Sequence, residues 1–141
     1  MVMKRVEGWP LKLSRFLRAR RDMPFAWGSN DCLMFAADAV KEITGIDLAL
    51  RWRGTYSTEE EAATILAGYG GVSGLISLAL GHNGTRNVMT AKRGDVAMIK
   101  TDQGEMAAIV DDSGARIAVP MSDKMTIVRF PLEKAWRVWG Y

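Results

Sequence analysis

Residues 25–45 have the sequence FAWGSNDCLMFAADAVKEITG, and this stretch, which contains the chain's single cysteine, Cys32, decides the fold that we expect. Its first six residues are typical of a loop because they contain Gly-Ser-Asn, whereas apolar residues recur at helical spacing in the remainder. The spacing predicts a helix that begins at Cys32. Asn30 or Asp31 can cap its first turn, and Gly45 suits the left-handed residue that ends a helix.

The predicted position of Cys32 favours a reactive thiol. The positive end of the peptide dipoles at a helix start stabilises a thiolate, so we expect a lowered pKa of the Cys32 thiol and a more nucleophilic sulfur. The neighbouring Asp31 acts in the opposite direction. A free cysteine is also one of the residue types most often buried, so Cys32 could instead fill the core beside Leu33, Met34 and Phe35.

Length and composition indicate one globular domain that spans residues 1–141, with 48% hydrophobic residues to form its core. One cysteine and one histidine provide neither an internal disulfide nor a cluster of zinc ligands, so we expect no metal site. The glycines have neither dinucleotide-binding nor Walker spacing, and we expect no cofactor. No window approaches the ~20 apolar residues of a membrane span, which predicts a soluble protein made in a reducing cytoplasm.

Basic residues are concentrated near the start of the chain, although the net charge is only +3. They are Lys4, Arg5, Lys12, Arg15, Arg18, Arg20 and Arg21. Such a patch attracts nucleic acid, an anionic wall polymer or an acidic protein. No RNA-binding pattern of interleaved aromatic residues and no helix-turn-helix accompanies it, so we prefer a solvated helix face and consider nucleic acid an unlikely partner.

The first two thirds of the chain have helical patterns. A first helix is expected at about residues 10–21, where leucine and phenylalanine alternate with arginine before Asp22-Met-Pro24. After the Cys32 helix, Ser57-Thr-Glu-Glu60 has the form of a capping box. It predicts the start of a helical hairpin at about 57–81, which is interrupted by glycines.

The last third has the pattern of a sheet. Short β-rich runs are separated by turns of hairpin length, which predicts an antiparallel sheet at about 94–141 whose strands pair in sequence order. We expect Trp136 and Trp139 to share one face of the final strand. Helices followed by strands are typical of an α+β domain, so we expect the Cys32 helix to pack on one face of the sheet.

This order of elements resembles the NlpC-type cell-wall cysteine peptidases, a papain-like superfamily. Asp31-Cys32 is similar to the family's nucleophile motif, and Arg93-Gly-Asp-Val-Ala-Met98 is similar to the segment that opens its sheet. A closer likeness is to small proteins encoded among phage tail genes. Their pattern resembles Trp27-Gly-x-x-Asp31-Cys32, Phe35-Ala-Ala-Asp38, Thr44-Gly45, Arg53-Gly54-x-Tyr56, Arg93-Gly94-Asp95 and Trp136-Arg137. The resemblance implies a papain-like α+β fold with Trp27, Asn30 and Asp31 lining a site around Cys32.

The resemblance also implies that the usual catalytic partners of the cysteine are missing. If Met106-Ala-Ala-Ile-Val110 corresponds to the family's His-Val-Gly-Ile-Tyr strand, Met106 replaces the catalytic histidine and Ala118 replaces the residue that orients it. Neither side chain can accept a proton. His82, between the helical hairpin and the sheet, is a weak candidate for the base. Asp111, Asp112 or Glu105 could also serve, although each is more simply explained as a solvated turn residue.

Three functions remain open. The favoured one is a phage tail-tip protein that keeps the peptidase fold as a degenerate or remodelled peptidoglycan hydrolase. Its partners would be other tail-tip or baseplate proteins, with peptidoglycan as a further possibility, and it would be made in the host cytoplasm and assembled into the virion. The alternatives are an active cysteine endopeptidase that cuts peptidoglycan stem peptides during phage entry, and a nucleic-acid-binding module that uses the basic first helix.

Overall fold

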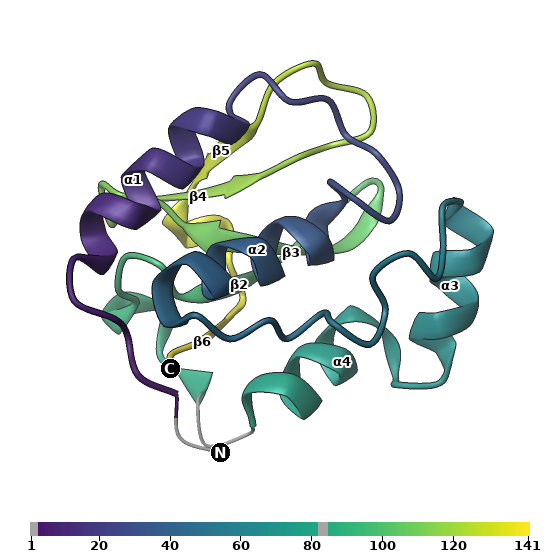
Figure 1. Ribbon diagram of the computed structural model, residues 1–141, viewed down its shortest axis with the longest axis horizontal. Helices are drawn as coiled ribbons and strands as arrows, with labels where there is room; N and C mark the ends of the chain where they lie inside the picture. Colours follow the sequence, from purple (N-terminus) through teal and green to yellow (C-terminus); the bar gives the residue numbers. More distant parts are fainter. Residues whose placement is uncertain (1–2, 82–84) are drawn as a thin grey trace.

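The computed structural model describes residues 3–81 and 85–141, and within these ranges the helices precede the sheet (Figure 1). The α-helices are α1 (Trp9–Arg20), α2 (Cys32–Thr44), α3 (Glu59–Ala67) and α4 (Gly71–Leu80). The strands are β1 (Thr85–Arg86), β2 (Val96–Thr101), β3 (Gly104–Val110), β4 (Arg116–Val119), β5 (Val128–Pro131) and β6 (Arg137–Trp139). All strand pairs are antiparallel, so the predicted α+β class is confirmed.

The strands form one sheet in the order β1-β6-β2-β3-β4-β5. Strands β2 to β5 pair in sequence order, as predicted, but β6 does not add to β5. A short 3-10 helix at Leu132–Lys134 turns the chain, and β6 then pairs with the free side of β2, where Trp139 lies opposite Val96. β1, which the sequence pattern did not predict, pairs with the outer side of β6.

Both faces of the sheet are buried. On one face α2 packs against the strands, and Figure 1 shows α1 on one side of α2 and α4 on the other. The cluster on this face includes Leu13, Phe16, Leu17, Phe35, Ala39, Ile43, Met98, Ala107, Ile109, Ala118 and Trp139. The opposite face has a second cluster that includes Ile99, Met106, Ala108, Val110, Ile117, Val119, Met121, Ala135 and Val138. Burial of both faces explains why the strand sequences are almost continuously apolar.

The bounds of α2 follow from local caps. The side chain of Asp31 accepts a hydrogen bond from the backbone N–H of Met34 (2.9 Å), and Gly45 ends the helix with a φ of 79°. Of the two expected N-cap residues, the structure therefore uses Asp31.

The α3–α4 hairpin begins one residue later than predicted. Thr58, not Ser57, caps α3 by accepting from the backbone N–H of Glu61 (3.2 Å), and Glu61 in turn accepts from the N–H of Ser57 (3.1 Å). The sequence Ser-Thr-Glu-Glu-Glu permits a capping box in both registers, so the pattern could not separate them. In the described ranges no single helix is long and apolar enough to cross a membrane, although α3 and α4 together meet that test and are bent by 63°.

The two tryptophans near the end of the chain do not share a face. Trp139 is completely buried against α2, whereas Trp136 is 51% exposed. Side chains alternate along a strand, so residues three positions apart point to opposite faces. The prediction of a common face was wrong for this reason.

Candidate functional site

The loop before α2 is held by the carboxylate of Asp31, which is buried. Besides capping α2, it accepts hydrogen bonds from the backbone N–H of Gly28 (2.8 Å) and from the hydroxyl of Tyr56. Gly28 has a φ of 85°, and a Cβ at this position would overlap the carbonyl oxygen of Tyr56. The carboxylate therefore joins the loop, the start of α2 and the segment that contains Tyr56.

Asn30 holds the same loop through other contacts. Its amide donates to the carbonyl oxygens of Met23 (3.2 Å) and Pro24 (3.0 Å), and its side-chain oxygen accepts from Arg20 (3.2 Å). The side chain is buried and is not one of the residues that line the cavity at Cys32. Asn30 thus positions the loop without facing the site.

A network of ion pairs fastens the segment after α2 to that helix. Asp38 accepts from Arg20 (2.6 Å) and from Arg53, whose guanidinium also binds Asp47 (2.7 Å). The hydrogen bond from Arg53 lowers the pKa of Asp47, and the two carboxylates raise the pKa of Arg53. A guanidinium presents several N–H donors in fixed directions, so the network determines the path of the chain toward Tyr56.

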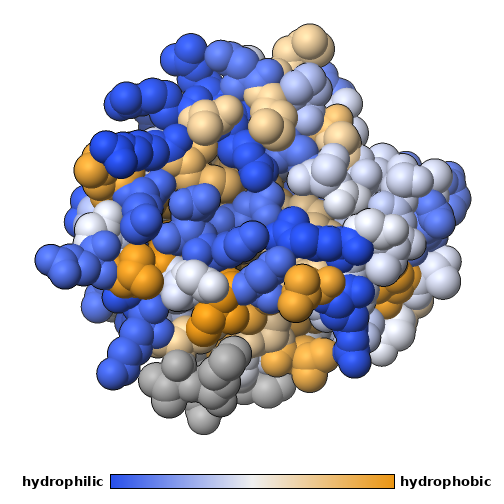
Figure 2. All heavy atoms as spheres, in the orientation of Figure 1, coloured by the Kyte–Doolittle hydropathy of each residue, from blue (hydrophilic) through white to orange (hydrophobic). Residues whose placement is uncertain are grey.

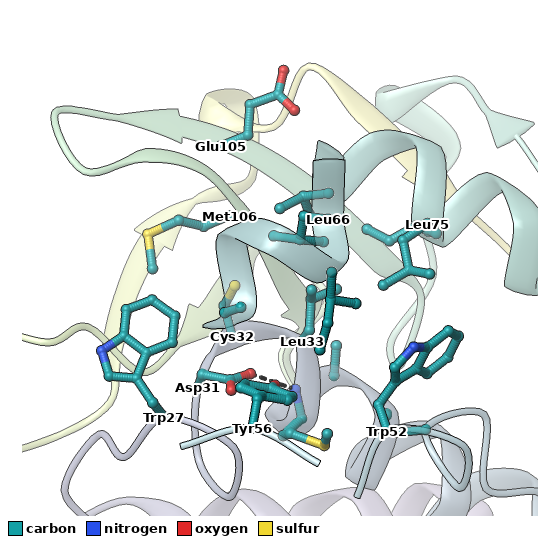
Figure 3. Close-up of a pocket in the computed structure, with 18 of the residues that line it drawn as sticks. Trp27, Asp31, Cys32, Leu33, Trp52, Tyr56, Leu66, Leu75, Glu105 and Met106 are labelled. Atoms are coloured by element: carbon teal, nitrogen blue, oxygen red, sulfur yellow. Dashed lines mark hydrogen bonds between the residues drawn. The ribbon is translucent and has the colours of Figure 1, made fainter. Parts of the chain in front are cut away.

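A cavity of about 460 Å³ lies between α2, α3, α4 and the start of β3. One end is lined by Trp27, Asp31, Cys32, Tyr56 and Met106. Figure 3 shows Met106 and Trp27 near the Cys32 sulfur, and Tyr56 beneath it with its ring beside Asp31. The structure thus brings together four of the residues expected at the site, Trp27, Asp31, Cys32 and Met106.

The thiol of Cys32 is half-buried on the cavity wall, and its pKa is raised. Burial, with a smaller contribution from the charge of Asp31, raises its pKa to about 12. The backbone N–H groups of Ala107, Leu33 and Cys32 itself favour the thiolate but have less effect. The expectation of a lowered pKa was therefore wrong in direction, because a helix dipole supplies only ~0.3–1 kcal/mol and does not compensate for the loss of water around the sulfur.

Positions 106 and 107 of β3, the two that could correspond to the family's histidine, offer no proton acceptor. Ala118 on β4 pairs with Ile109 and lies on the face of the sheet that packs against α2, but it does not line the cavity. Successive side chains alternate, so Ala107 shares that face, whereas Met106 belongs to the opposite face and reaches the cavity wall. Methionine and alanine are both unable to act as a base, whichever of the two corresponds to the family's histidine.

The other candidate bases are not assembled around the thiol. His82 lies outside the described residues. Glu105 lines the cavity, but its carboxylate points away from Cys32 in Figure 3. Asp111 accepts from Arg129 (2.6 Å) and organises the turn between β3 and β4, and Asp112 accepts from Ser14 of α1 (3.1 Å). These two aspartates therefore have structural contacts away from the cavity.

Sequence reasoning missed the part of the cavity that comes from α3 and α4. Leu66 and Leu75 come from these helices, and Trp52 and Tyr56 come from the segment between α2 and α3. Of these four residues, the sequence pattern includes only Tyr56, and it assigns no role to it. The apolar residues of the 57–81 hairpin indicate that one of its sides is buried, but the sequence does not indicate which element that side packs against. Among residues 3–81 and 85–141, no group of three or more His, Cys, Asp or Glu side chains could hold a metal ion.

Comparison with known proteins supports the fold. A solved structure described as "Crystal structure of NlpC/p60 domain of peptidoglycan hydrolase SagA" is similar to this one with a TM-score of 0.57 and 15% sequence identity, over 94% of this chain and 98% of that chain. This similarity confirms the NlpC-like fold. A search of curated proteins gave no match. A family model described as "Domain of unknown function (DUF6950)" matches residues 4–140, and the chain therefore belongs to that family.

Proposed function

We propose that this protein is a phage tail-tip component that keeps the fold of a cell-wall cysteine peptidase without its hydrolytic activity. The observation that carries the proposal is the state of Cys32: its thiol pKa is raised to about 12, and β3 presents methionine and alanine beside it. Hydrolysis by a cysteine requires a thiolate, a base to form it and an acid to protonate the leaving amine. In the described site the thiol is protonated at pH 7, the Asp31 carboxylate already accepts three hydrogen bonds, and the Glu105 carboxylate points away from the sulfur.

The expected loss of activity is large. With a pKa of about 12, only about one thiol in 100,000 is ionised at pH 7. A positioned base ordinarily contributes a further ~100- to 10,000-fold to the rate. We therefore expect turnover of peptidoglycan stem peptides to be absent or barely measurable.

The assignment to a tail tip is supported by the pattern that begins at Trp27 and by the surface. That pattern resembles the one in small proteins encoded among phage tail genes. On the face that Figure 2 shows, hydrophobic residues are interspersed among hydrophilic ones. Several large apolar side chains of the described residues are more than half exposed, among them Leu50, Met89, Met125 and Trp136. Tryptophan and methionine are enriched at protein interfaces. Other tail-tip or baseplate proteins in the virion are the partners that we propose, after synthesis in the host cytoplasm.

The test of inactivity uses purified cell wall. The wild type, Cys32→Ala, Met106→His and Ala107→His are incubated with it, and soluble stem-peptide fragments are measured by mass spectrometry. We expect no release by the wild type or by Cys32→Ala. A gain of release in one histidine variant would identify which strand position once held the base. Robust release by the wild type that disappears in Cys32→Ala would overturn the proposal.

The test of assembly is co-expression with each neighbouring tail protein. A stable complex with at least one of them is expected by size-exclusion chromatography. If the protein elutes as a monomer beside every neighbour, the tail-tip assignment fails.

An active endopeptidase is the second candidate, and one observation favours it. The N–H groups of Ala107, Leu33 and Cys32 act on the sulfur, and donors of this kind can stabilise a thiolate or an oxyanion. His82 would then be the candidate base. In that case cleavage by the wild type should be lost both in Cys32→Ala and in His82→Ala. The nucleic-acid hypothesis has weaker support, because Arg5 and Arg20 of the basic segment are paired with Asp95 and Asp38.

A further inference from the structure

The cavity extends well beyond Cys32, into a space between α2 and the α3–α4 hairpin. This apolar arm is lined by Val40 and Leu48 together with Trp52, Leu66, Leu75 and Ile76. Figure 3 shows Trp52 and Leu75 at the end of the pocket opposite Trp27. The thiol chemistry considered above makes no use of the apolar arm.

Small side chains keep the apolar arm open. Alanines line it from three helices: Ala37 of α2, Ala62 and Ala63 of α3, and Ala79 of α4. Protein interiors are normally packed with few voids larger than a water molecule, which occupies ~30 Å³ in the liquid. This cavity of about 460 Å³ opens to solvent at the exposed residues Glu59 and Glu105, and its volume is in the range of ligand-binding pockets.

The charges on the cavity wall have one sign. The chain carries 19 lysine and arginine residues and a net charge of +3. Nevertheless, no basic side chain is among the described residues that line the cavity, whereas Asp31, Glu59 and Glu105 are. Asp31 already accepts three hydrogen bonds from the protein. Glu59 and Glu105 are exposed and leave their carboxylates available for a cation.

Exposed polar groups on the cavity wall suit a peptide better than a bare hydrocarbon. Gln103 and Ser122 line the cavity, where the Ser122 hydroxyl donates to the Gln103 amide oxygen (3.1 Å). The Gln103 side-chain N–H₂ and the second lone pair of its oxygen can bond a peptide backbone. A peptide backbone can form these hydrogen bonds, whereas an aliphatic chain cannot.

We propose that this cavity binds a short peptide segment of a partner protein, with apolar side chains in the apolar arm and a lysine or arginine beside Glu59 and Glu105. The inference rests on the proposed role in an assembly and names the chemistry of the partner. It requires no reaction at Cys32.

The test selects peptides from a displayed random heptapeptide library on the Cys32→Ala protein, so that catalysis cannot consume them. Ala63→Leu, which adds bulk to the cavity wall, is the counter-selection. Its matched control is Ala67→Leu, one turn further along the same helix, at an exposed position that does not line the cavity. We expect enrichment of peptides that combine apolar residues with lysine or arginine, and affinity for the best peptide at least about tenfold weaker in Ala63→Leu than in Ala67→Leu. Thermal melts establish that each variant is folded.

A second pair of variants tests the charge. The double variant Glu59→Gln and Glu105→Gln should bind the selected peptide about three- to tenfold more weakly and lose its salt dependence, whereas Glu60→Gln, outside the cavity, should bind it normally. The inference would be overturned if no peptide were enriched on Cys32→Ala relative to Ala63→Leu, or if the enriched peptides were acidic. Binding of decyltrimethylammonium without any selected peptide would overturn it in favour of a free amphiphile, and self-association lost in Ala63→Leu would do so in favour of a second copy. Wall cleavage by the wild type with peptide binding intact in Cys32→Ala would refute the proposed function but not this inference.

Discussion

Cys32 allows a direct test of the site, because it is the single thiol of the chain and every alkylation event reports on it. The perturbation is a pH series from about 6 to 11 in which the folded protein reacts with iodoacetamide. The same protein unfolded in guanidinium chloride is the reference, and Cys32→Ala is the blank.

The expected difference can be calculated from the raised pKa. Folding raises the pKa of the thiol from 9.0 to about 12, so at pH 7 the folded protein contains about 1,000-fold less thiolate than the unfolded protein. A thiolate of higher pKa is more nucleophilic, and a Brønsted coefficient of ~0.4–0.5 returns roughly 15- to 30-fold. The folded protein should therefore react roughly 30- to 60-fold more slowly, before any steric effect of burial.

The assay is intact mass spectrometry against time at each pH. For the folded protein the rate should rise about tenfold per pH unit as far as about pH 11, whereas the unfolded reference should be half-maximal near pH 9 and approach a plateau near pH 10. A plateau well below pH 9 in the folded protein, or alkylation faster than in the unfolded protein, would mean that the start of α2 stabilises the thiolate more than burial opposes it. That result would refute the reasoning.

Three further predictions concern stability. The folded pKa of Cys32 is raised above 9.0, so the contribution of the protonated thiol to the unfolding free energy is complete below pH 9.0 and is lost as the pH rises toward about 12. Between about pH 8 and 10.5, urea unfolding should therefore show a larger loss of unfolding free energy for the wild type than for Cys32→Ala. An equal loss in both would contradict the raised pKa. Gly28→Ala should lower the unfolding free energy by more than ~1 kcal/mol, because alanine disfavours a positive φ and its Cβ would displace the Tyr56 carbonyl; an unchanged denaturation midpoint would contradict this. Arg53→Lys should cost ~1–3 kcal/mol in thermal or urea unfolding because lysine cannot bind Asp38 and Asp47 together, whereas Arg51→Lys on the surface should stay within ~0.5 kcal/mol; equal effects would argue against the network.

Elements with local signals were predictable from the sequence. α2 begins at Cys32 and ends before Gly45 as expected, because its caps are formed by residues next to the helix. The hairpin-length turns likewise specified the pairing of β2 to β5. The position of β6 was not predictable, since β5 and β2 both offered an edge and the choice depends on the turn at Leu132–Lys134 and on packing across the sheet.

The site was predictable only in part, because some of its properties depend on contacts between distant segments. The dipole of α2 is a local property, and it gave the wrong direction for the pKa of Cys32 because burial depends on the strand and the hairpin packed around the sulfur. The contact between Asp31 and Tyr56 also joins distant segments. The spacing of Asp31 and Tyr56 along the chain does not predict their contact, although both residues belong to the sequence pattern that begins at Trp27.

Much of the sequence pattern that begins at Trp27 has a structural role in this fold. Gly28 and Asp31 hold the loop, Asp38 and Arg53 form an ion pair, and Asp95 binds Arg5 (2.7 Å) near the start of the chain. Such residues are needed to fold the domain whether or not it hydrolyses anything. Hydrolysis, by contrast, depends on a base at one or two positions of β3. A domain of this kind can therefore lose catalysis through very few substitutions and keep the fold.

The apolar arm is separable from catalysis for a related reason. Its shape comes from α3, α4 and the middle of α2, which contribute neither the thiol nor the strand beside it. Substitution of a base on β3 would leave those helices and the carboxylates of Glu59 and Glu105 in place. A cavity that does not cleave its ligand can retain it. Retention is the property that a docking site in a permanent assembly requires, so loss of the base and use of the cavity for binding are compatible consequences of one architecture.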